Sequence, residues 1–361
     1  MLNCLLIVSE NSNHLQQVYF GFQLLQKAGL ISLKQTFEFD SPDFINNRVI
    51  PFGAQSGGLK LIVDSSIRIF YDMADSHDVN EKNLAWANFY FKRSYSEELH
   101  NGISTKIMPL DLNYMVKPEQ VHWQSLTRAF HLSSGTERVK ACIRELDIKN
   151  KISYLPRINE LQAAPSLNEP FKVLFMCRLW EPDKDDHWQL TKAQQEDRIE
   201  INHVRVDCIR KLKKEFGHEF TGGLAPTAYA RENFNDVVSS ASVTSKRNYI
   251  TQLKKYPVCI STTGLANSIG WKFGEYVALS RAIVSEKLHS QTAGNIQKDI
   301  NYLQFDTADK CVEQVHRLRS NKELMINMMQ ANHNYYINHL APDKLIMSSL
   351  QRALSLSQGT H

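Results

Sequence analysis

Long apolar runs are missing from this chain, and so is any excess of charge of one sign. No window approaches the roughly 18 consecutive apolar residues needed to cross a bilayer, and 42 basic residues against 38 acidic ones leave a net charge of only +4. The first absence excludes a transmembrane helix. The second excludes the strongly basic surface of nucleic-acid-binding proteins, although a weak positive bias suits a diphosphate ligand or an anionic membrane surface.

Cysteine is sparse, and no targeting segment is visible. The six cysteines form no CxxC pair and lie mostly in apolar runs, which is typical of buried free thiols in a reducing compartment. The opening residues, MLNCLLIVSENSN, lack a basic region and predict a first β-strand rather than a signal peptide. We therefore expect a cytoplasmic protein, and we leave open peripheral contact with the inner membrane surface.

Several motifs that would decide the chemistry directly are also absent. The chain has no GxGxxG fingerprint, no GxxxxGK[ST] phosphate loop, no HExxH pair and no GxSxG turn. The acidic stretch DKDDHW, residues 183–188, lacks a recognisable ligand spacing and is expected to be a solvated loop. We predict no metal site and no cofactor.

The length and the hydrophobic pattern predict two α/β domains. A chain of 361 residues exceeds one ordinary core, and strand-like and helix-like segments alternate along it. The polar, Pro-flanked stretch QAAPSLNEP, residues 162–170, is the best linker. We expect an irregular Rossmann-like domain over residues 1–162, a more regular one over 163–340, and a final helix over 341–361.

Individual elements follow from local patterns. We expect helices at 16–27, around the apolar stripe of residues 201–216, at 249–255, from about residue 271, and at 343–356. We expect strands at residues 2–9, 31–39, 59–64, 68–72, 88–91, 106–110, 171–179, 220–224, 258–261 and 282–285.

The stretch STTGLANSIGWKFGEYVALSRAIVSE, residues 261–286, is the most informative part of the chain. Gly264, Ser268 and Gly270 follow a β-branched strand and allow a tight turn close to a ligand. A helix that begins near Trp271 would direct backbone N–H groups at that turn, which favours a phosphate. A loop of this kind without any ligand is also common in βαβ units.

Two charged residues of the following helix strengthen the phosphate interpretation. Lys272 adds a positive charge at the start of the helix, and Glu275, about one turn later, could accept hydrogen bonds from a ribose diol. We therefore take Gly264, Ser268, Gly270, Lys272 and Glu275 as candidate nucleotide-binding residues. A lysine in a first helical turn is otherwise simply solvated.

These residues resemble the donor-binding core of glycosyltransferases with the GT-B fold. In the retaining families of that fold, two glutamates separated by seven residues flank the loop and helix, and the second opens a run similar to EAMAxGxPVV. The run EYVALSRAIVS aligns with it and places the second glutamate at Glu275, whereas the first position holds Asn267. Shorter matches to a bacterial group of surface-polysaccharide enzymes are YFKRSY at 90–95, Asn113-Tyr114 and NYLQF at 301–305.

The resemblance implies a fold and an activity. It implies two Rossmann-like domains that face a cleft, with the C-terminal helix crossing back to the first domain. It implies a transferase that moves a sugar from a nucleotide sugar to a glycan or lipid-linked acceptor held by the first domain. Domain closure would then exclude water, which otherwise hydrolyses the donor. Asn267 in place of an acid puts the sugar and the stereochemical outcome in doubt.

Candidate catalytic residues lie after other strands. Arg178, after the strand at 171–179, could hold the leaving diphosphate together with Lys272; an ion pair with Glu181 or Asp183 is the alternative. Asp75 and His77, with Asp72 in YDMADSHD, are candidates for the base that an inverting enzyme needs. Loop or capping roles are common for such residues.

The sequence says less about the role of four other polar residues in the first half. Glu10 and His14 follow the first strand. Lys92 and Arg93 could contact phosphate or acceptor, or could form structural ion pairs.

Two other functions stay open. A module that binds a nucleotide or sugar without catalysis would explain Asn267. A sugar-nucleotide epimerase of the same fold would need carboxylates around the sugar ring, and the sequence does not identify them.

Overall fold

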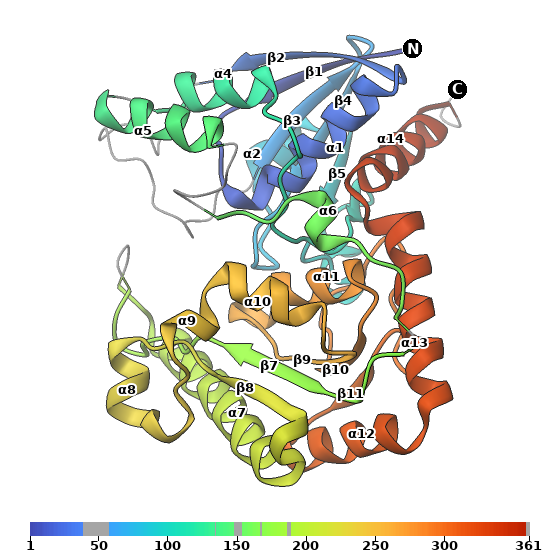
Figure 1. Cartoon of the computed structure of the whole chain (residues 1–361). Helices are drawn as coiled ribbons and strands as arrows, with labels where there is room; N and C mark the ends of the chain where they lie inside the picture. Colours follow the sequence, from blue (N-terminus) through green and yellow to red (C-terminus); the bar gives the residue numbers. More distant parts are fainter. Residues whose placement is uncertain (39–57, 134, 148–153, 167, 186–188, 359–361) are drawn as a thin grey trace. The chain divides into compact units, whose positions relative to one another are not determined.

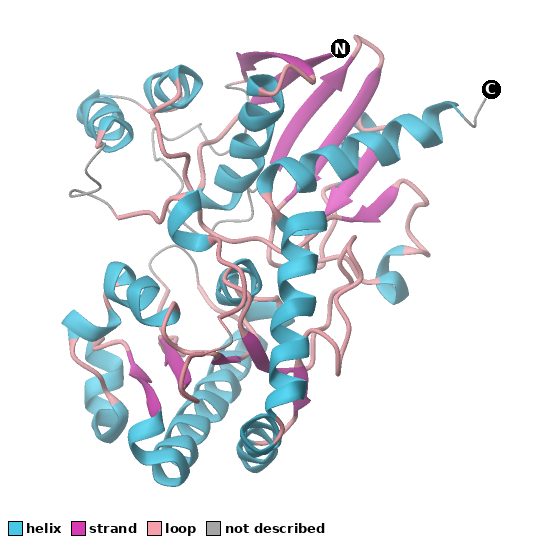
Figure 2. Ribbon diagram, turned by 45° about the vertical axis from the view of Figure 1, so that its right-hand side comes forward, coloured by secondary structure: helices cyan, strands magenta, loops and turns pink. Residues whose placement is uncertain are grey.

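The computed structural model describes residues 1–38, 58–133, 135–147, 154–166, 168–185 and 189–358 (Figures 1 and 2). The chain divides into two compact units. Unit 1 comprises residues 1–159, 290–294 and 337–361, and unit 2 comprises residues 160–289 and 295–336. Each unit contains one β-sheet with helices packed on it.

The elements of unit 1 agree closely with the sequence pattern. Gln16–Lys27 is helical as predicted, because its apolar residues recur at helical spacing before Gly29, which has a φ of +71°. In chain order the elements are β1 Leu2–Val8, η1 Asn13–Leu15, α1 Gln16–Lys27, β2 Ile31–Phe37, β3 Gly58–Val63, β4 Ile67–Asp72, α2 Glu81–Trp86, β5 Phe89–Lys92, α3 Glu97–His100, β6 Ile107–Pro109, α4 Trp123–His131, α5 Gly135–Leu146 and, after unit 2, the π-helical η6 Tyr336–Leu340 and α14 Pro342–Gln358. Helix α6, Ile158–Leu161, lies at the junction of the units.

The sheet of unit 1 is mixed, which accounts for the irregular pattern of the N-terminal half. Its strand order is β2-β1-β3-β4-β5-β6, and β3 is antiparallel to both β1 and β4. Asp64 and Ser65 form the β3–β4 turn with φ values of 47° and 62°, the left-handed geometry of a tight hairpin. The other neighbouring pairs are parallel.

Unit 2 is the more regular unit, and its sheet is parallel throughout its described pairs. The strand order is β11-β10-β9-β7-β8. In chain order its elements are β7 Val173–Cys177, α7 Lys192–Phe216, η3 Gly217–Glu219, β8 Phe220–Leu224, α8 Ala228–Phe234, η4 Asn235–Val237, α9 Ala241–Thr244, α10 Lys246–Leu253, β9 Val258–Ser261, η5 Leu265–Asn267, α11 Trp271–Ala278, β10 Ala282–Glu286, β11 Leu303–Phe305, α12 Ala308–Ser320 and α13 Lys322–Tyr335.

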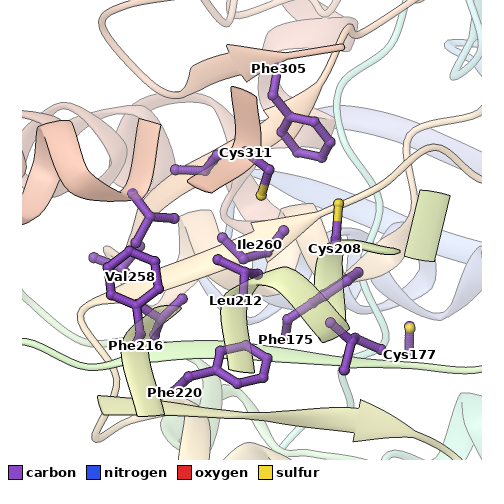
Figure 3. Close-up of a cluster of buried hydrophobic side chains, with 14 of the residues drawn as sticks. Phe175, Cys177, Cys208, Leu212, Phe216, Phe220, Val258, Ile260, Phe305 and Cys311 are labelled. Carbon is purple, nitrogen blue, oxygen red and sulfur yellow. The ribbon is translucent and has the colours of Figure 1, made fainter. Parts of the chain in front are cut away.

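The core of unit 2 lies between the sheet and helices α7 and α12. Strand residues such as Phe175 and Ile260 meet Leu212 of α7 and Cys311 of α12 in one cluster (Figure 3). Each of these four side chains is at most 2% exposed. The strands read as continuous apolar runs because both faces of a parallel sheet are covered.

The last helix of the chain belongs to unit 1, as the sequence predicts. Helix α14 lies against α1 (Figure 1), and its Leu345, Ile346 and Leu350 enter the core of unit 1. Gly21 of α1 permits this close approach, since a Cβ at that position would lie 2.2 Å from the Pro342 carbonyl oxygen. The predicted α/β class, with two Rossmann-like sheets and a returning C-terminal helix, is confirmed.

The sequence misjudged some bounds and missed some helices. The helix expected at 249–255 begins at Lys246, because Ser245 caps it by accepting a hydrogen bond from the Asn248 N–H. The strand expected at 31–39 ends at Phe37, and residue 39 lies outside the described residues. Helices α4 and α5 were not anticipated.

Candidate functional site

The carboxyl ends of β7 and β9 form the topological switch point of unit 2. The chain leaves β7 toward β8 on one side and returns through β9 on the other. The two strands pair only at Val173–Val258 and Leu174–Cys259, so the last residues of β7 have no ladder partner in β9. Ligands of open parallel sheets bind outside the strand ends at such a point.

Two basic side chains hold the separated strand ends. Lys272 of α11 donates a hydrogen bond to the backbone oxygen of Met176 in β7. Arg205 of α7 donates to the Arg178 oxygen at 2.6 Å, to Thr262 Oγ1 at 3.1 Å and to the Thr263 oxygen at 3.0 Å. The loop after β9 is therefore fixed to the end of β7 by side chains rather than by the ladder.

Burial changes the acid–base properties of Lys272. Burial is the main cause that lowers the pKa of its ammonium to about 8, and the neighbouring Lys246 and Arg205 charges lower it further. An anion bound beside Lys272 would oppose this shift by stabilising the charged form.

Glu275 is wholly buried and forms an ion pair that the sequence did not reveal. Its side chain has no exposed surface, and its Oε1 accepts a hydrogen bond from Lys246, whose side chain is 31% exposed. Its Oε2 is buried without a hydrogen-bond partner. The ammonium groups of Lys246 and Lys272 lie 5.1 Å and 5.2 Å from the ring centre of Tyr249.

An unsatisfied buried carboxylate oxygen is costly. Leaving a buried charged acceptor unpaired costs about 1–3 kcal/mol or more, so a hydroxyl donor that reached Oε2 would recover that free energy. The predicted role of Glu275 toward a ribose diol remains a prediction. Its burial means that the diol would have to enter beside Lys246.

The glycine-containing loop borders a separate small hollow. Its volume is only about 10 Å³, room for about one water molecule and far less than the roughly 300–1,000 Å³ of sites for whole small molecules. Hydroxyl groups and one lysine dominate its lining, which comprises Ser261, Thr262, Thr263, Asn267, Ser268, Ile269, Gly270, Ser285, Lys287 and Leu288. In this conformation the hollow has no room for a phosphate group. Lys287, which lines it, is a further cation that the sequence analysis missed.

Residue 267 has a conformation that accounts for asparagine. Ala266 and Asn267 have φ values of 54° and 58° within the short helix η5. Asparagine tolerates this left-handed region better than most residues with a Cβ. A glutamate at 267 would be strained in this backbone. The loop conformation therefore explains why this position holds asparagine and not the acid of the glycosyltransferase pattern.

Arg178 is exposed at the end of β7. Its guanidinium stacks over Trp180 at 4.7 Å. Among the described residues no carboxylate pairs with it, including Glu181 and Asp183. Stacking keeps an arginine oriented while its N–H groups remain available.

A second hollow of unit 2 has the wrong charge for a nucleotide. A groove of about 480 Å³ runs between α7 and the start of α12, lined by Glu196, Glu200, Asp207 and Asp306 among others. Four carboxylates repel a diphosphate. The groove is therefore a poor candidate for the predicted nucleotide site.

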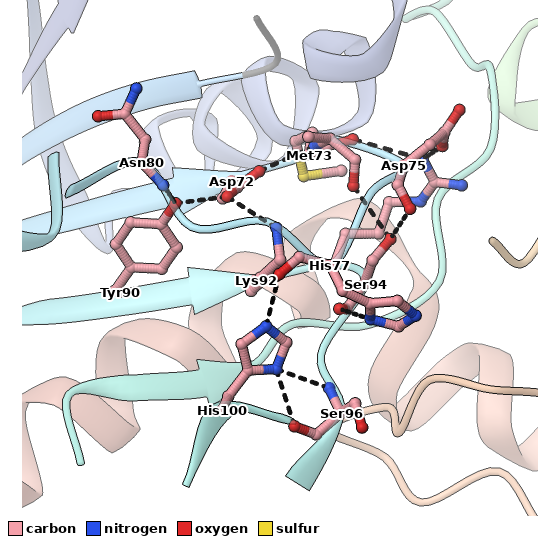
Figure 4. Close-up of polar contacts among 12 residues, drawn as sticks. Asp72, Met73, Asp75, His77, Asn80, Tyr90, Lys92, Ser94, Ser96 and His100 are labelled. Atoms are coloured by element: carbon pink, nitrogen blue, oxygen red, sulfur yellow. Dashed lines mark hydrogen bonds and ion pairs between the residues drawn. The ribbon is translucent and has the colours of Figure 1, made fainter. Parts of the chain in front are cut away.

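In unit 1, Asp72 is a structural residue. Its Oδ2 accepts hydrogen bonds from Lys92 Nζ at 3.0 Å and from the Tyr90 hydroxyl, and its Oδ1 accepts from the Ala74 N–H at 2.9 Å (Figure 4). Lys92 has no exposed side-chain surface. The alternative of a structural ion pair therefore holds for Lys92, and contact of Lys92 with phosphate or acceptor is excluded in this conformation.

His77 is oriented as a general base needs to be. Its Nδ1 donates to the Ser94 carbonyl oxygen at 2.8 Å (Figure 4), which leaves Nε2 with its lone pair in the neutral ring. Burial, opposed in part by this hydrogen bond, lowers the pKa of His77. The loop itself is anchored by His100, whose Nε2 donates to the His77 carbonyl oxygen at 2.8 Å.

Asp75 and His14 lie near Arg93. Asp75 Oδ1 forms an ion pair with Arg93, although its side chain is 45% exposed. Burial, followed by the Arg93 charge, lowers the pKa of His14 to about 4. The Asp75 carboxylate is already held by the Arg93 guanidinium, whereas among the described residues Nε2 of His77 has no such partner, so the geometry favours His77 over Asp75.

The structure thus sorts the predicted residues into three groups. Ser268 and Gly270 line the small hollow after β9, while Gly264 closes the loop by donating its N–H to the Ser268 oxygen at 2.9 Å. Lys272 and Glu275 meet Lys246 and Tyr249. Asp75 and His77 belong to unit 1.

The described residues contain neither a three-ligand metal cluster nor a helix that could span a membrane. In that part of the chain, no group of three His, Cys, Asp or Glu side chains could hold a metal ion. No helix there combines the length and apolar character needed to cross a membrane.

The chain is similar to solved glycosyltransferases and sugar-nucleotide epimerases. A glycosyltransferase from Rickettsia africae matches with 12% identity and a TM-score of 0.40, over 96% of this chain and 83% of that one. Anabaena HepE in complex with UDP-glucose matches with 9% identity and a TM-score of 0.41, over 98% of both chains. UDP-GlcNAc 2-epimerase from Neisseria meningitidis matches with 13% identity and a TM-score of 0.38, over 75% of this chain and 63% of that one.

No protein-family model and no curated protein matches the sequence. At these identities and TM-scores we transfer no activity and no residue role from the solved structures to this chain.

Proposed function

We propose that this protein is a glycosyltransferase that moves a sugar, of hexose type, from a nucleotide sugar to a glycan or lipid-linked acceptor in the cytoplasm. Bacterial surface polysaccharide synthesis is the setting that the sequence resemblance favours. The observation that carries the proposal is the switch point of unit 2, where Glu275 has a buried oxygen without a partner beside Lys246 and Lys272.

The proposed binding mode follows from the chemistry of these groups. The ribose diol donates to Glu275, because a buried carboxylate gains most from hydroxyl donors. Ser268, Gly270 and Lys287, which line the small hollow after β9 and β10, contact one phosphate once the loop has opened to admit it. Arg178 and Lys272 supply charge to the diphosphate.

The proposed chemical step is displacement of the nucleoside diphosphate from the sugar. Negative charge grows on the leaving phosphate, and preorganised cations stabilise it in the transition state. His77 Nε2 takes the proton of the acceptor hydroxyl if the enzyme inverts configuration.

Nucleotide binding and donor turnover test the proposal. We expect calorimetry to detect binding of a nucleoside diphosphate from a panel of bases, and we expect Glu275→Gln to weaken it about ten-fold or more, since a hydrogen bond to a charged group contributes roughly 1.5–3 kcal/mol. Glu196→Gln, in the acidic groove, is the matched control and should bind normally. Equal affinity of the wild-type and Glu275→Gln proteins would reject the ribose role.

Asn267 favours a second candidate, a module that binds a nucleotide sugar without transferring it. The position that carries an acid in the retaining families is here an asparagine in a left-handed turn. Release of free nucleoside diphosphate in the presence of an acceptor extract separates the two functions. Binding without release at any acceptor concentration would support the module.

A further inference from the structure

Helix α4 of unit 1 has a polar inner face. Its buried residues are Gln124, Ser125, Arg128 and Ala129, and only the last of these is apolar. A helix that covers a domain core normally turns apolar side chains inward. The inner face of α4 therefore contains polar groups that have been removed from water and that need partners.

Arg128 is the residue for which burial costs most. It is 2% exposed, and burial lowers its pKa, although an arginine keeps its charge at neutral pH. Its guanidinium carbon lies 3.9 Å from the ring centre of Tyr19. Among the described residues, no carboxylate oxygen lies within 4.0 Å of its nitrogens, and Glu145 of α5 attracts the charge only from farther away.

The hydrogen bonds of Arg128 are few and mostly long. Its Nε donates to Asn11 Oδ1 at 3.4 Å, its Nη1 to Gln35 Oε1 at 3.4 Å, and its Nη2 to Ser125 Oγ at 3.1 Å. All three acceptors are neutral, and the remaining guanidinium N–H groups have no acceptor in the described part of the chain. Buried charges are normally paired or fully hydrogen-bonded, so this charge is only partly compensated.

Gln124 adds an unpaired amide to the same face. It lies one helical turn before Arg128, so the two side chains are neighbours on α4. Gln124 is 1% exposed, and neither its Nε2 nor its Oε1 has a hydrogen-bond partner among the described residues. A free donor and a free acceptor beside a partly compensated cation suit a ligand that carries both an anionic group and a hydroxyl.

These groups lie where ligands of parallel strands bind. Asn11 is in the loop after β1, and Gln35 lies near the end of β2, which is parallel to β1. Gln35 also holds α4, because its Nε2 donates to the Gln124 backbone oxygen at 3.2 Å and to Thr127 Oγ1. Asn11 and Gln35 are both partly exposed, so the guanidinium can be approached between them.

We propose that Arg128 and Gln124 form an anion site in unit 1 that binds a hydroxylated carboxylate or phosphate, such as a sugar acid or a sugar phosphate. The anionic oxygens replace the two long hydrogen bonds of Arg128 with charge-assisted ones, for which the planar guanidinium is suited. A ligand hydroxyl donates to Gln124 Oε1. The inference rests on the proposed function only in taking this ligand to be the acceptor, which then carries a negative charge.

Calorimetry with the full-length protein tests the proposal. The probes are glucuronate and glucose 6-phosphate, with glucose as the neutral control, all without nucleotide. We expect at least one of the two anions to bind, and glucose to bind about ten-fold or more weakly, since it lacks the group that pairs with Arg128. The comparison of the two anions distinguishes a carboxylate ligand from a phosphate ligand.

Two substitutions of Arg128 separate its charge from its shape. Arg128→Met removes the charge and should weaken binding of the anion about ten-fold or more. Arg128→Lys keeps the charge without the planar fork and should weaken binding less. Arg68→Met, at an exposed arginine of β4, is the matched control and should bind normally.

Gln124 gives a readout that a structural role would reverse. Gln124→Leu removes an unpaired buried amide, so we expect it to raise the melting temperature of unit 1 by about 2–4 °C while it weakens anion binding. Gln17→Leu is the matched control, because the buried Gln17 amide is bonded to the Leu340 oxygen and to the Tyr114 N–H. That substitution should lower the melting temperature. A lower melting temperature for Gln124→Leu would reject the ligand role of Gln124.

Several outcomes would overturn the proposal. These are no binding of either anion, equal binding of glucose, unchanged anion binding by Arg128→Met, or displacement of the anion by a nucleoside diphosphate, which would place it at the donor site. Circular dichroism verifies the fold of each variant, and the comparison with glucose needs only the wild type. The binding assay needs no glycosyl transfer, so its failure is distinguishable from failure of the proposed function.

Discussion

At the scale of single residues, the ion pair between Lys246 and Glu275 occupies the carboxylate that we propose for the ribose. They are 29 positions apart, yet Lys246 is the only described group that pairs with the Glu275 carboxylate. A ribose that binds Oε2 must share this carboxylate with Lys246. Lys246 would remain paired with Oε1, and its ammonium would lie near the bound ribose, because its side chain keeps partial exposure.

Lys272 gives a prediction about pH. Its pKa of about 8 in the folded chain is below the usual 10.5, so between these values the unfolded chain binds more protons and folding stability rises with pH. The free-energy cost of burying the charged Lys272 ammonium is fully present below about pH 8 and is relieved by about pH 10.5. We expect the wild type to gain about 3 kcal/mol relative to Lys272→Met across this range, measured by denaturant unfolding without ligand. Parallel curves for the two proteins would contradict the burial of a charged lysine.

His77 gives a prediction about the chemical step. His77→Gln removes the basic Nε2, while the amide can still donate a hydrogen bond toward the Ser94 carbonyl oxygen. If the enzyme inverts, we expect turnover to fall roughly 100- to 10,000-fold with unchanged nucleotide affinity, because the nucleotide residues belong to unit 2.

His131→Gln, an exposed histidine on α4, serves as the matched control for His77. Near-normal turnover of His77→Gln would place the base elsewhere or indicate retention of configuration, which NMR of the product would identify.

At the scale of elements, the contact between α1 and α14 depends on one glycine. A Cβ at position 21 would lie 2.2 Å from the Pro342 carbonyl oxygen and 2.6 Å from Ile346 Cγ1. We expect Gly21→Ala to destabilise unit 1 by about 1–3 kcal/mol through overpacking, despite the better helix propensity of alanine. Denaturant unfolding measures this, and Gly102→Ala, where a Cβ would meet nothing within 4 Å, is the control. Equal stability of both variants would show that α14 can shift without cost.

Elements with a strong local signal were predictable from the sequence. The strand Val258–Ser261 and the start of α11 at Trp271 were found at their observed positions, because a β-branched run and a glycine-containing loop mark them. Helix α5 was missed, since its outward stripe contributes nothing buried to the core pattern. Helix α4 was missed because the residues that it buries, Gln124, Ser125, Arg128 and Ala129, are mostly polar.

The candidate site was only partly predictable. Lys246 and Lys287 escaped notice because tertiary packing brings them to Glu275 and to the loop after β9, and no spacing rule connects them. Asp72 was taken as part of a catalytic cluster, but its partners Tyr90 and Lys92 lie on the neighbouring strand β5 and could not be paired with it from sequence.

At the scale of the whole molecule, unit 1 is assembled from three pieces of the chain. Residues 290–294 and 337–361 join the first 159 residues. The short middle piece is hydrogen-bonded into unit 1, for example from the Gly294 N–H to Asp111 Oδ2 at 2.9 Å. Unit 2, by contrast, contains every predicted nucleotide residue.

Removal of the last helix should therefore affect the two units differently. A chain that ends at Tyr336 loses Leu345, Ile346 and Leu350, which are at most 3% exposed, and each contributes about 1.5–3 kcal/mol by burial. That sum approaches the total stability of a typical domain, so we expect unit 1 to unfold while nucleotide binding by unit 2 persists. Hydrogen exchange of the β1 and β4 amides measures the first effect and calorimetry the second. Full protection of those amides would show that α14 is dispensable.

The three-piece construction of unit 1 also sets an order of events during synthesis. Domains generally fold in the order in which they leave the ribosome, but here the first 159 residues must wait for residues 337–361, which follow all of unit 2 in the chain. Throughout translation of unit 2, the apolar face of α1 that α14 finally covers remains uncovered. Nascent chains of this protein should therefore depend on chaperones that hold the N-terminal half until residues 337–361 have been synthesised.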